Sequence, residues 1–142
     1  MGRFIFIPNN DNLILSDTGI KGNVHYKFND TPYKIATTIP SEEKIKRICL
    51  LVVKKNKYAV GLEYTYGEDF TPVVVFRTEN TKETVLLCKK NDIKIIYDDT
   101  LAMALYKHGE IDEIIPTELW ENTAKLLAKI MKSDKKFLKR IS

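Results

Sequence analysis

The sequence predicts an α/β fold in which helices pack on a four-stranded mixed sheet, with an extra β-rich segment at the N-terminus. Residues 48–53 are apolar at every position, which is typical of a central strand covered on both faces. Residues 72–77 are nearly all apolar, and a helix over 81–91 and a strand over 93–97 follow. A strand, a helix and a strand joined by short connections predict a right-handed parallel crossover, so we expect one strand pair to be parallel.

Two more elements are predicted before this crossover. The segment 58–66 alternates large apolar residues with smaller or polar ones, which predicts a strand. A turn at Gly67-Glu68-Asp69 then leads into the next strand. Upstream, Ser41 followed by two glutamates predicts the N-cap and first turn of a short helix that runs toward Arg47.

Helix positions are predicted from caps and from the 3.6-residue period. Asp98 or Asp99 can cap a helix through Lys107, and Thr117 can cap the last helix. In the helix over 81–91 the expected inward residues are Val85, Leu86 and Cys88. In the last helix the apolar period comprises Leu119, Trp120, Thr123, Leu126, Leu127, Ile130 and Met131.

Composition divides the chain into three parts. Residues 1–46 are a β-rich segment of unknown role, residues 47–132 form the α/β domain, and residues 133–142 form a basic C-terminal tail. In the first part we expect strands over 4–7, 13–15, 24–28 and 33–39, separated by turns rich in Asn, Asp and Pro. The strand over 4–7 could pair within its own sheet or with a neighbouring chain, so the sequence leaves the oligomeric state unknown.

The composition is that of a globular domain: 44% of the 142 residues are hydrophobic and 30% are charged. No apolar run approaches the roughly 20 residues that cross a bilayer, and no secretory leader is evident, so we expect a cytoplasmic protein. Cys49 and Cys88 lie in apolar stretches without a nearby Cys or His, which indicates reduced core thiols and no metal site. The six glycines are scattered singly, so no phosphate-binding loop or other cofactor site is predicted.

The formal charge of +4 concentrates at residues 54–57 and 132–140. Such clusters usually form an ordinary exposed surface. The alternative is that they attract anionic lipid or an acidic partner. No nucleic acid is expected as a partner, because the chain has no helix-turn-helix or zinc-finger pattern. His25 and His108 are the only histidines, and each is more typical of a surface or capping residue than of a catalytic base, so we expect no catalytic residues.

From residue 58 the chain reads YAVGLEY, TPVVVFR, IKIIYDDTLAMALYKHGEI and IPTELWENTAKLLAKIM. In order and spacing these motifs resemble the cytoplasmic C-terminal domain of the FlhB/YscU family of type III export switch proteins. That resemblance implies the four-stranded fold predicted above. The chain departs from the family pattern at several positions: Gly61 stands where the family usually has Ala, Asp99 and Thr100 stand for two prolines, Met103 replaces an Arg, and Trp120 replaces a Tyr.

The departure with the largest chemical consequence lies just before the strand at 58. The family has an Asn-Pro-Thr-His turn there that cuts its own backbone when the Asn amide attacks its carbonyl, an intramolecular reaction that depends on proximity. This chain has Lys54, Lys55, Asn56 and Lys57 at the matching positions. Lys54 has no carboxamide, and Lys57 is not a neutral base near pH 7. We therefore expect a degenerate loop that stays covalently closed.

The resemblance also implies a shallow apolar patch that docks export signals. On this chain the matching residues are Thr71 and Pro72, at the start of the third strand, and Ala102 and Leu105, in the helix that begins near residue 98. Periodicity alone gives a second interpretation, in which Ala102 and Leu105 simply pack their helix on the sheet.

Two functions from different classes remain. The leading hypothesis is a soluble, non-cleaving accessory of a flagellar or type III protein export apparatus, without the membrane domain, that binds export substrates or apparatus proteins. Its expected location is the cytoplasm or the inner face of the membrane. The alternative is a structural or regulatory binding protein that reuses this fold outside protein export.

Overall fold

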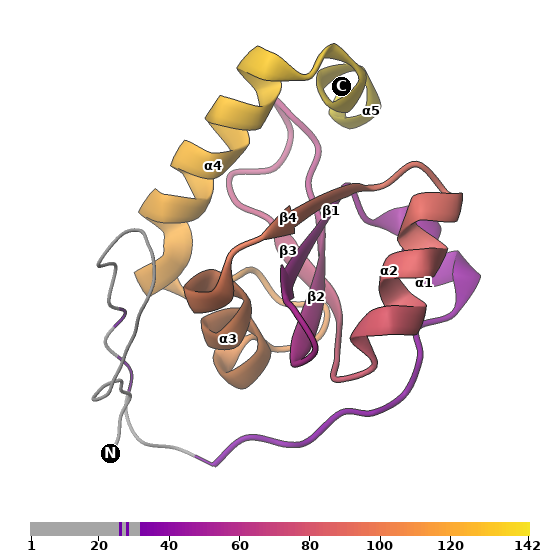
Figure 1. Cartoon of the computed structure of the whole chain (residues 1–142). Helices are drawn as coiled ribbons and strands as arrows, with labels where there is room; N and C mark the ends of the chain where they lie inside the picture. The colour runs from indigo at the N-terminus through magenta and orange to yellow at the C-terminus, as the bar shows by residue number, and fades with distance from the viewer. Residues whose placement is uncertain (1–25, 27, 29–31) are drawn as a thin grey trace. The chain divides into compact units, whose positions relative to one another are not determined.

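The computed structural model describes residues 26, 28 and 32–142 (Figure 1). The chain separates into two units, Met1–Lys34 and Ile35–Ser142, and the second contains all the helices and strands of the described residues. The strands predicted over 4–7 and 13–15 lie outside the described residues, as does most of the one over 24–28. Among the described residues, no helix is long and apolar enough to cross a membrane.

The compact unit Ile35–Ser142 combines four strands with five α-helices and a short 3₁₀ turn. In chain order the elements are α1 (Glu42–Arg47), β1 (Leu50–Lys54), β2 (Tyr58–Glu63), β3 (Val73–Thr78), α2 (Thr81–Lys90), β4 (Lys94–Tyr97), α3 (Asp99–His108), the 3₁₀ turn η2 (Thr117–Leu119), α4 (Trp120–Ser133) and α5 (Lys135–Ile141). Each strand and helix predicted between residues 41 and 131 is present within a few residues of its expected bounds.

The strands form one mixed sheet in the order β3-β2-β1-β4. β1 and β2 form an antiparallel hairpin, and β2 pairs with β3 in the same antiparallel sense, with a register shift between Gly61 and Leu62. β4 returns through α2 to pair in parallel with β1, Leu51 opposite Ile95. The prediction of a mixed four-stranded sheet is confirmed.

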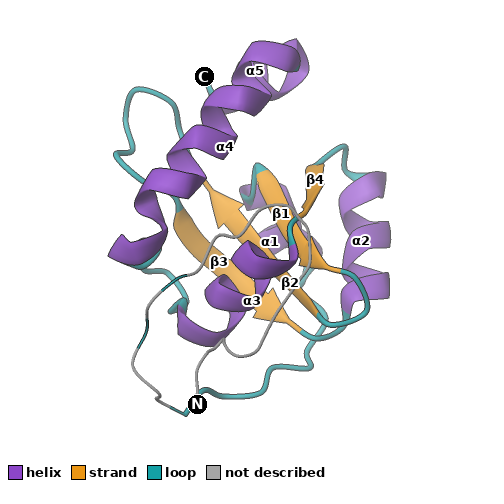
Figure 2. Cartoon of the chain, turned by 60° about the vertical axis from the view of Figure 1, so that its left-hand side comes forward, coloured by secondary structure: helices purple, strands orange, loops and turns teal. Residues whose placement is uncertain are grey.

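Helices cover both faces of β1, whose residues Leu50–Val53 are each at most 1% exposed. Leu51 and Val53 belong to a cluster with Ile45 of α1 and Cys88 of α2. Because side chains alternate along a strand, Leu50 and Val52 point to the opposite face, where α3 contacts β1 and β2. α4 and α5 lie together toward one end of the sheet (Figure 2).

Two of the three predicted helix caps are confirmed. The Ser41 hydroxyl accepts a hydrogen bond from Lys44 N at 3.3 Å, and an Asp98 carboxylate oxygen accepts one from Leu101 N at 3.1 Å. Thr117 does not cap α4, because residues 117–119 form a 3₁₀ turn and the helix begins only at Trp120. α3 ends at His108, one residue beyond its predicted end, with Gly109 as its C-cap.

Three local expectations are corrected. Residues 32–41 are extended without a strand partner, so the strand predicted over 33–39 is absent. Leu86 is 66% exposed, because α2 instead buries the ridge of Thr81, Thr84 and Cys88. The segment expected as a basic tail forms α5, in which Phe137 and Ile141 are buried. Alternating β-branched residues favour an extended chain, but a strand also needs a paired neighbour, and this segment has none.

Both cysteines are free and buried, as predicted. Burial raises the pKa of the Cys49 thiol and of the Cys88 thiol to about 12, so each stays protonated near pH 7. They are core residues of the sheet layer and not nucleophiles.

The extended chain before α1 is fixed to the domain by Tyr106 of α3 and by the end of β3. The buried Tyr106 hydroxyl accepts a hydrogen bond from Ala36 N at 2.8 Å and donates one to a Glu79 carboxylate oxygen at 2.7 Å. Glu79 N donates to Ala36 O at 2.7 Å, and the Thr78 hydroxyl donates to Thr38 O at 2.9 Å. Tyr106 therefore joins three segments that are distant in the sequence.

Replacing Tyr106 by Phe should lower the free energy of unfolding by about 1–3 kcal/mol, because two half-buried hydrogen bonds, to Ala36 N and to the Glu79 carboxylate, are lost while the ring remains. Burial, and then the bond to Glu79, raise the Tyr106 pKa. The stabilisation from the neutral hydroxyl is therefore present below about pH 10, the ordinary tyrosine value, and is lost as pH rises through the folded-state pKa. Urea unfolding at neutral and alkaline pH measures both effects. Tyr97→Phe is the control, since Tyr97 is 57% exposed; equal stability of the two variants would contradict this role.

Candidate functional site

The predicted docking patch divides into two parts in the structure. Ala102 and Leu105 are both 0% exposed, and they pack α3 against the sheet. Their assignment to an exposed patch is corrected, and the packing interpretation holds for these two residues. Thr71 and Pro72 lie elsewhere, where the chain enters β3, and they line a surface groove.

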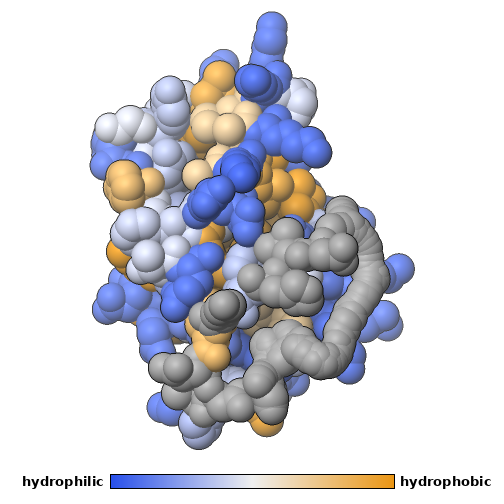
Figure 3. Space-filling view, turned by 90° about the vertical axis from the view of Figure 1, so that its left-hand side faces the viewer, coloured by the Kyte–Doolittle hydropathy of each residue, from blue (hydrophilic) through white to orange (hydrophobic). Residues whose placement is uncertain are grey.

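This surface groove, called the α4 groove here, lies between the β2–β3 connection and α4 and has a volume of about 360 Å³. Thr71 and Pro72 therefore line the groove together with Ala124 and Leu127 of α4, and Ala102 and Leu105 of α3 are not among the groove residues. Apolar surface is exposed on the face of the molecule that carries α4 (Figure 3). The groove residues are Tyr64, Phe70, Thr71, Pro72, Trp120, Glu121, Ala124, Leu127 and Met131.

Helix geometry explains why α4 presents one continuous wall. Trp120, Ala124, Leu127 and Met131 are spaced by four, three and four residues, so their side chains form a single ridge. The η2 turn before α4 sets where this ridge begins. The Trp120 indole N–H donates to Ile115 O at 2.9 Å, which fixes the ring at the start of the wall.

Phe70 supplies the opposite wall and is 85% exposed. Its ring meets the Trp120 ring edge to face, with centroids 5.4 Å apart and planes at 81°. The only carboxylate among the groove residues, Glu121, pairs with Lys125 at 3.0 Å. The groove thus offers three aromatic rings, those of Tyr64, Phe70 and Trp120, and an apolar floor with little charge.

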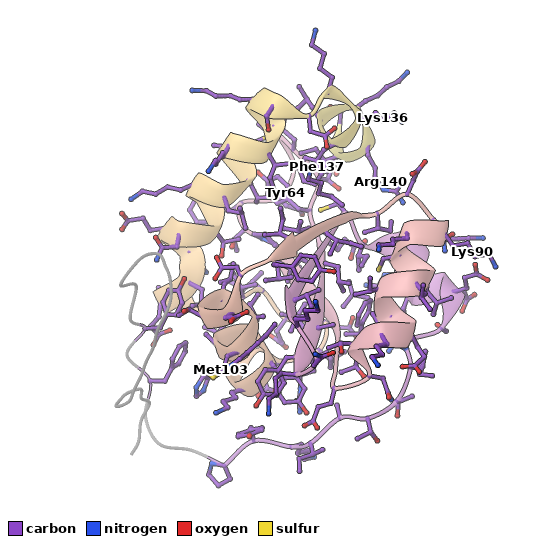
Figure 4. All side chains as sticks on the ribbon, in the orientation of Figure 1. Tyr64, Lys90, Met103, Lys136, Phe137 and Arg140 are labelled. Atoms are coloured by element: carbon purple, nitrogen blue, oxygen red, sulfur yellow. The ribbon has the colours of Figure 1, made fainter. Side chains whose placement is uncertain are left out.

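α5 holds the connection that carries Phe70. Tyr66 N donates to Ile141 O at 2.8 Å, and within the connection Asp69 accepts from Thr65 N at 2.7 Å. Figure 4 shows Phe137 on the side of α5 that faces the sheet. Sequence reasoning missed this contribution, although Phe137 and Ile141 at i and i+4 after a capping Asp134 are the signal of a packed helix.

The degenerate loop is a tight hairpin turn between β1 and β2. Lys57 N donates to Lys54 O at 2.9 Å, and Asn56 has a φ of 63°. A positive φ at the third position is the requirement of a type II turn, and Asn tolerates it well. Asn56 is therefore explained by backbone conformation alone.

Lys54 leaves the turn and lies against α3. Its ammonium is 4.0 Å from the sulfur of Met103, which lies on α3 (Figure 4). Burial lowers the Lys54 pKa, an effect that nearby Asp99 opposes. The two departures from the family pattern are in contact, and an Arg in place of Met103 would set a second cation against Lys54.

The described residues show no arrangement for metal chemistry. Within 26, 28 and 32–142, no three His, Cys, Asp or Glu side chains gather to hold an ion. The groove has apolar surface and aromatic rings, and both suit the binding of apolar side chains.

Comparison with known proteins identifies the family of this domain. The sequence model described as the FlhB HrpN YscU SpaS Family matches residues 40–130. The Yop proteins translocation protein U of Yersinia pestis is 33% identical over 87 residues, which are 60% of this chain and 25% of that protein. The flagellar biosynthetic protein FlhB of Bacillus subtilis is 24% identical over 96 residues, 66% of this chain and 27% of that protein. The chain therefore spans about a quarter of the length of these relatives.

Solved structures give the same result at the level of the fold. A mutated EscU C-terminal domain matches with a TM-score of 0.57 at 28% identity, covering 62% of this chain and 90% of that one. The cytoplasmic domain of FlhB from Shewanella putrefaciens matches with a TM-score of 0.57 at 23% identity, covering 63% and 76%, and shows the fold alone. The chain belongs to the FlhB HrpN YscU SpaS family and carries the type III export component domain of that family.

Proposed function

We propose that this domain is a non-cleaving accessory of a flagellar or type III export apparatus that binds export substrates or apparatus proteins in the α4 groove. We place it at the cytoplasmic face of the membrane. The observation that carries the proposal is the groove itself, where the exposed Phe70 ring meets Trp120 beside Pro72.

The groove suits an apolar anchor of a protein partner. Phe70 keeps most of its ring in water, and large exposed aromatic side chains beside an apolar hollow are typical of interaction sites. A small-molecule site would add convergent polar groups that fix a ligand's orientation. Here Glu121 is engaged by Lys125, and the indole N–H of Trp120 is engaged by Ile115.

The non-cleaving part of the proposal is supported by the turn. Lys54 directs its side chain to Met103 and has no amide with which to attack its own carbonyl. Lys55 provides an ordinary peptide N–H where the family pattern has the ring nitrogen of Pro. Asn56 keeps a carboxamide, but it stands two positions after Lys54, where the family pattern has the attacking Asn.

The partner prediction compares two substitutions on one helix. Ala124→Glu places a charge in the groove, whereas Ala128→Glu places it at an exposed position of α4 outside the groove. Immobilised chain should recover apparatus or exported proteins from the native cell, and Ala124→Glu should lose them because the charge is left unpaired in an apolar contact. Ala128→Glu should retain them. Equal recovery by both variants, or recovery of partners unrelated to export, would contradict the proposal that export proteins bind in the α4 groove.

A stability comparison separates the groove from the core. Ala102→Glu should destabilise the domain by more than about 3 kcal/mol, because Ala102 is fully buried between α3 and the sheet. Ala124→Glu should stay within about 0.5 kcal/mol of the parent, as exposed substitutions usually do. Thermal melting of the two proteins decides the point. An unchanged melting temperature for Ala102→Glu would contradict the burial of Ala102 between α3 and the sheet.

The loop prediction is that the purified chain remains one polypeptide. Intact-mass measurement after long incubation at neutral and mildly alkaline pH is the test, and two fragments parting between Lys54 and Lys55 would exclude a non-cleaving domain. As a positive control, the family's residues can be restored together by Lys54→Asn, Lys55→Pro, Asn56→Thr and Lys57→His. That protein should yield the two fragments.

A further inference from the structure

Charge is strongly segregated along the compact unit. Residues 125–142 hold seven basic residues and one acidic residue, whereas residues 35–124 hold twelve basic and fifteen acidic ones. The positive excess of the unit therefore lies entirely in the second half of α4 and in α5. Hydrophilic side chains project from the corresponding end of the molecule, at the top of Figure 3.

The basic residues at this end are exposed and free of ion pairs within the described part of the chain. We call six of them the C-terminal basic surface: Lys129, Lys132, Lys135, Lys136, Lys139 and Arg140. Lys125 is left out because Glu121 pairs with it. The one acidic residue within 125–142, Asp134, is already engaged by Lys94 at 3.1 Å and caps α5 through Phe137 N. It therefore does not pair with any of the six cations.

The apolar side of α5 is not available for contact. Phe137 and Ile141 are 3% and 2% exposed, because they pack into the domain. Lys135 and Lys139 lie on the opposite side of the helix, close to half a turn away from Phe137. Any binding by this surface must therefore come from electrostatic attraction, without insertion of the helix.

We propose that the C-terminal basic surface binds the anionic lipid headgroups of a bilayer. Lysine is depleted from protein interfaces, which rely on desolvated aromatic anchors such as those of the α4 groove. A group of four to eight exposed Lys or Arg on a helix, with no apolar pocket among them, is instead the pattern that anionic membranes attract. Five of the six cations are lysines, which act as point charges and need no particular acceptor geometry.

The inference deepens the membrane-face position proposed above and rests on it, but not on the groove. Lipid binding and partner binding can be tested independently, because a variant can lose binding to vesicles and still recover partners through the α4 groove. With the basic end against lipid, the membrane would hold the domain by α5 and the last turns of α4.

Vesicle sedimentation of the full chain tests the proposal. Binding is expected to phosphatidylcholine vesicles that contain a minor fraction of phosphatidylserine, and not to phosphatidylcholine alone. Raising the salt from 0.1 M to 1 M, where the Debye length falls from about 10 Å to about 3 Å, should release the protein. A variant neutralised on α5 should partition about tenfold more weakly, or worse; it carries Lys135→Gln, Lys136→Gln and Lys139→Gln.

The matched control removes the same charge from helices outside the C-terminal basic surface. It carries Lys44→Gln, Lys46→Gln and Lys89→Gln, at exposed positions of α1 and α2, and should bind nearly as the parent does. Equal loss in both variants would show that only net charge matters and would overturn the proposal. So would retention of the chain by immobilised polyglutamate without binding to the anionic vesicles, which would assign the surface to an acidic protein. Circular dichroism melts confirm that each variant is folded.

Discussion

The structure depends on the burial of β1 on both faces. Leu50–Val53 are excluded from water, so the domain requires helices on each side of the sheet, and the strand requires partners on both edges. α1 and α2 cover one face and α3 the other, while β4 crosses over to take the edge beside β1. α4 and α5 pack at the end of this layered sheet, and α4 forms one wall of the groove. The proposed binding surface is therefore built on the last elements of the chain and supported by the buried core.

The sequence predicted the elements better than their contacts. An unbroken apolar run identified β1, and Ser41 and Asp98 identified two helix starts, because these signals are local. The groove was missed because the resemblance assigned the docking patch to Ala102 and Leu105, and the pair Ala124 and Leu127 has the same i, i+3 spacing on another helix. Periodicity states that a helix buries one face, but not which part of the sheet that face meets. Trp120 and Met131 extend the apolar stripe of α4, and they were the signal for the second pair. In α5 the many basic residues favoured the interpretation as a tail, although Phe137 and Ile141 are spaced to form an apolar side of a helix.

Departures from the family pattern are explained by their neighbours. An added Cβ at Gly61 would lie 2.5 Å from the Phe76 ring and 3.0 Å from Ile48, so the glycine accommodates a large side chain on the adjacent strand. Lys54 and Met103 form a second compensated pair. In both cases, residues that are distant in the sequence lie side by side in the fold.

The central claim is that partners occupy the α4 groove, and Trp120 reports on it directly because it is the only tryptophan of the chain. Its ring lies against Phe70 and lines the groove, so a partner's side chain must change its surroundings. The measurement is the Trp120 emission during titration with a purified, tryptophan-free segment of a recovered export protein, alongside calorimetry. The account predicts a saturable change in emission with the affinity that calorimetry gives. Binding seen by calorimetry with no change in Trp120 emission would contradict it.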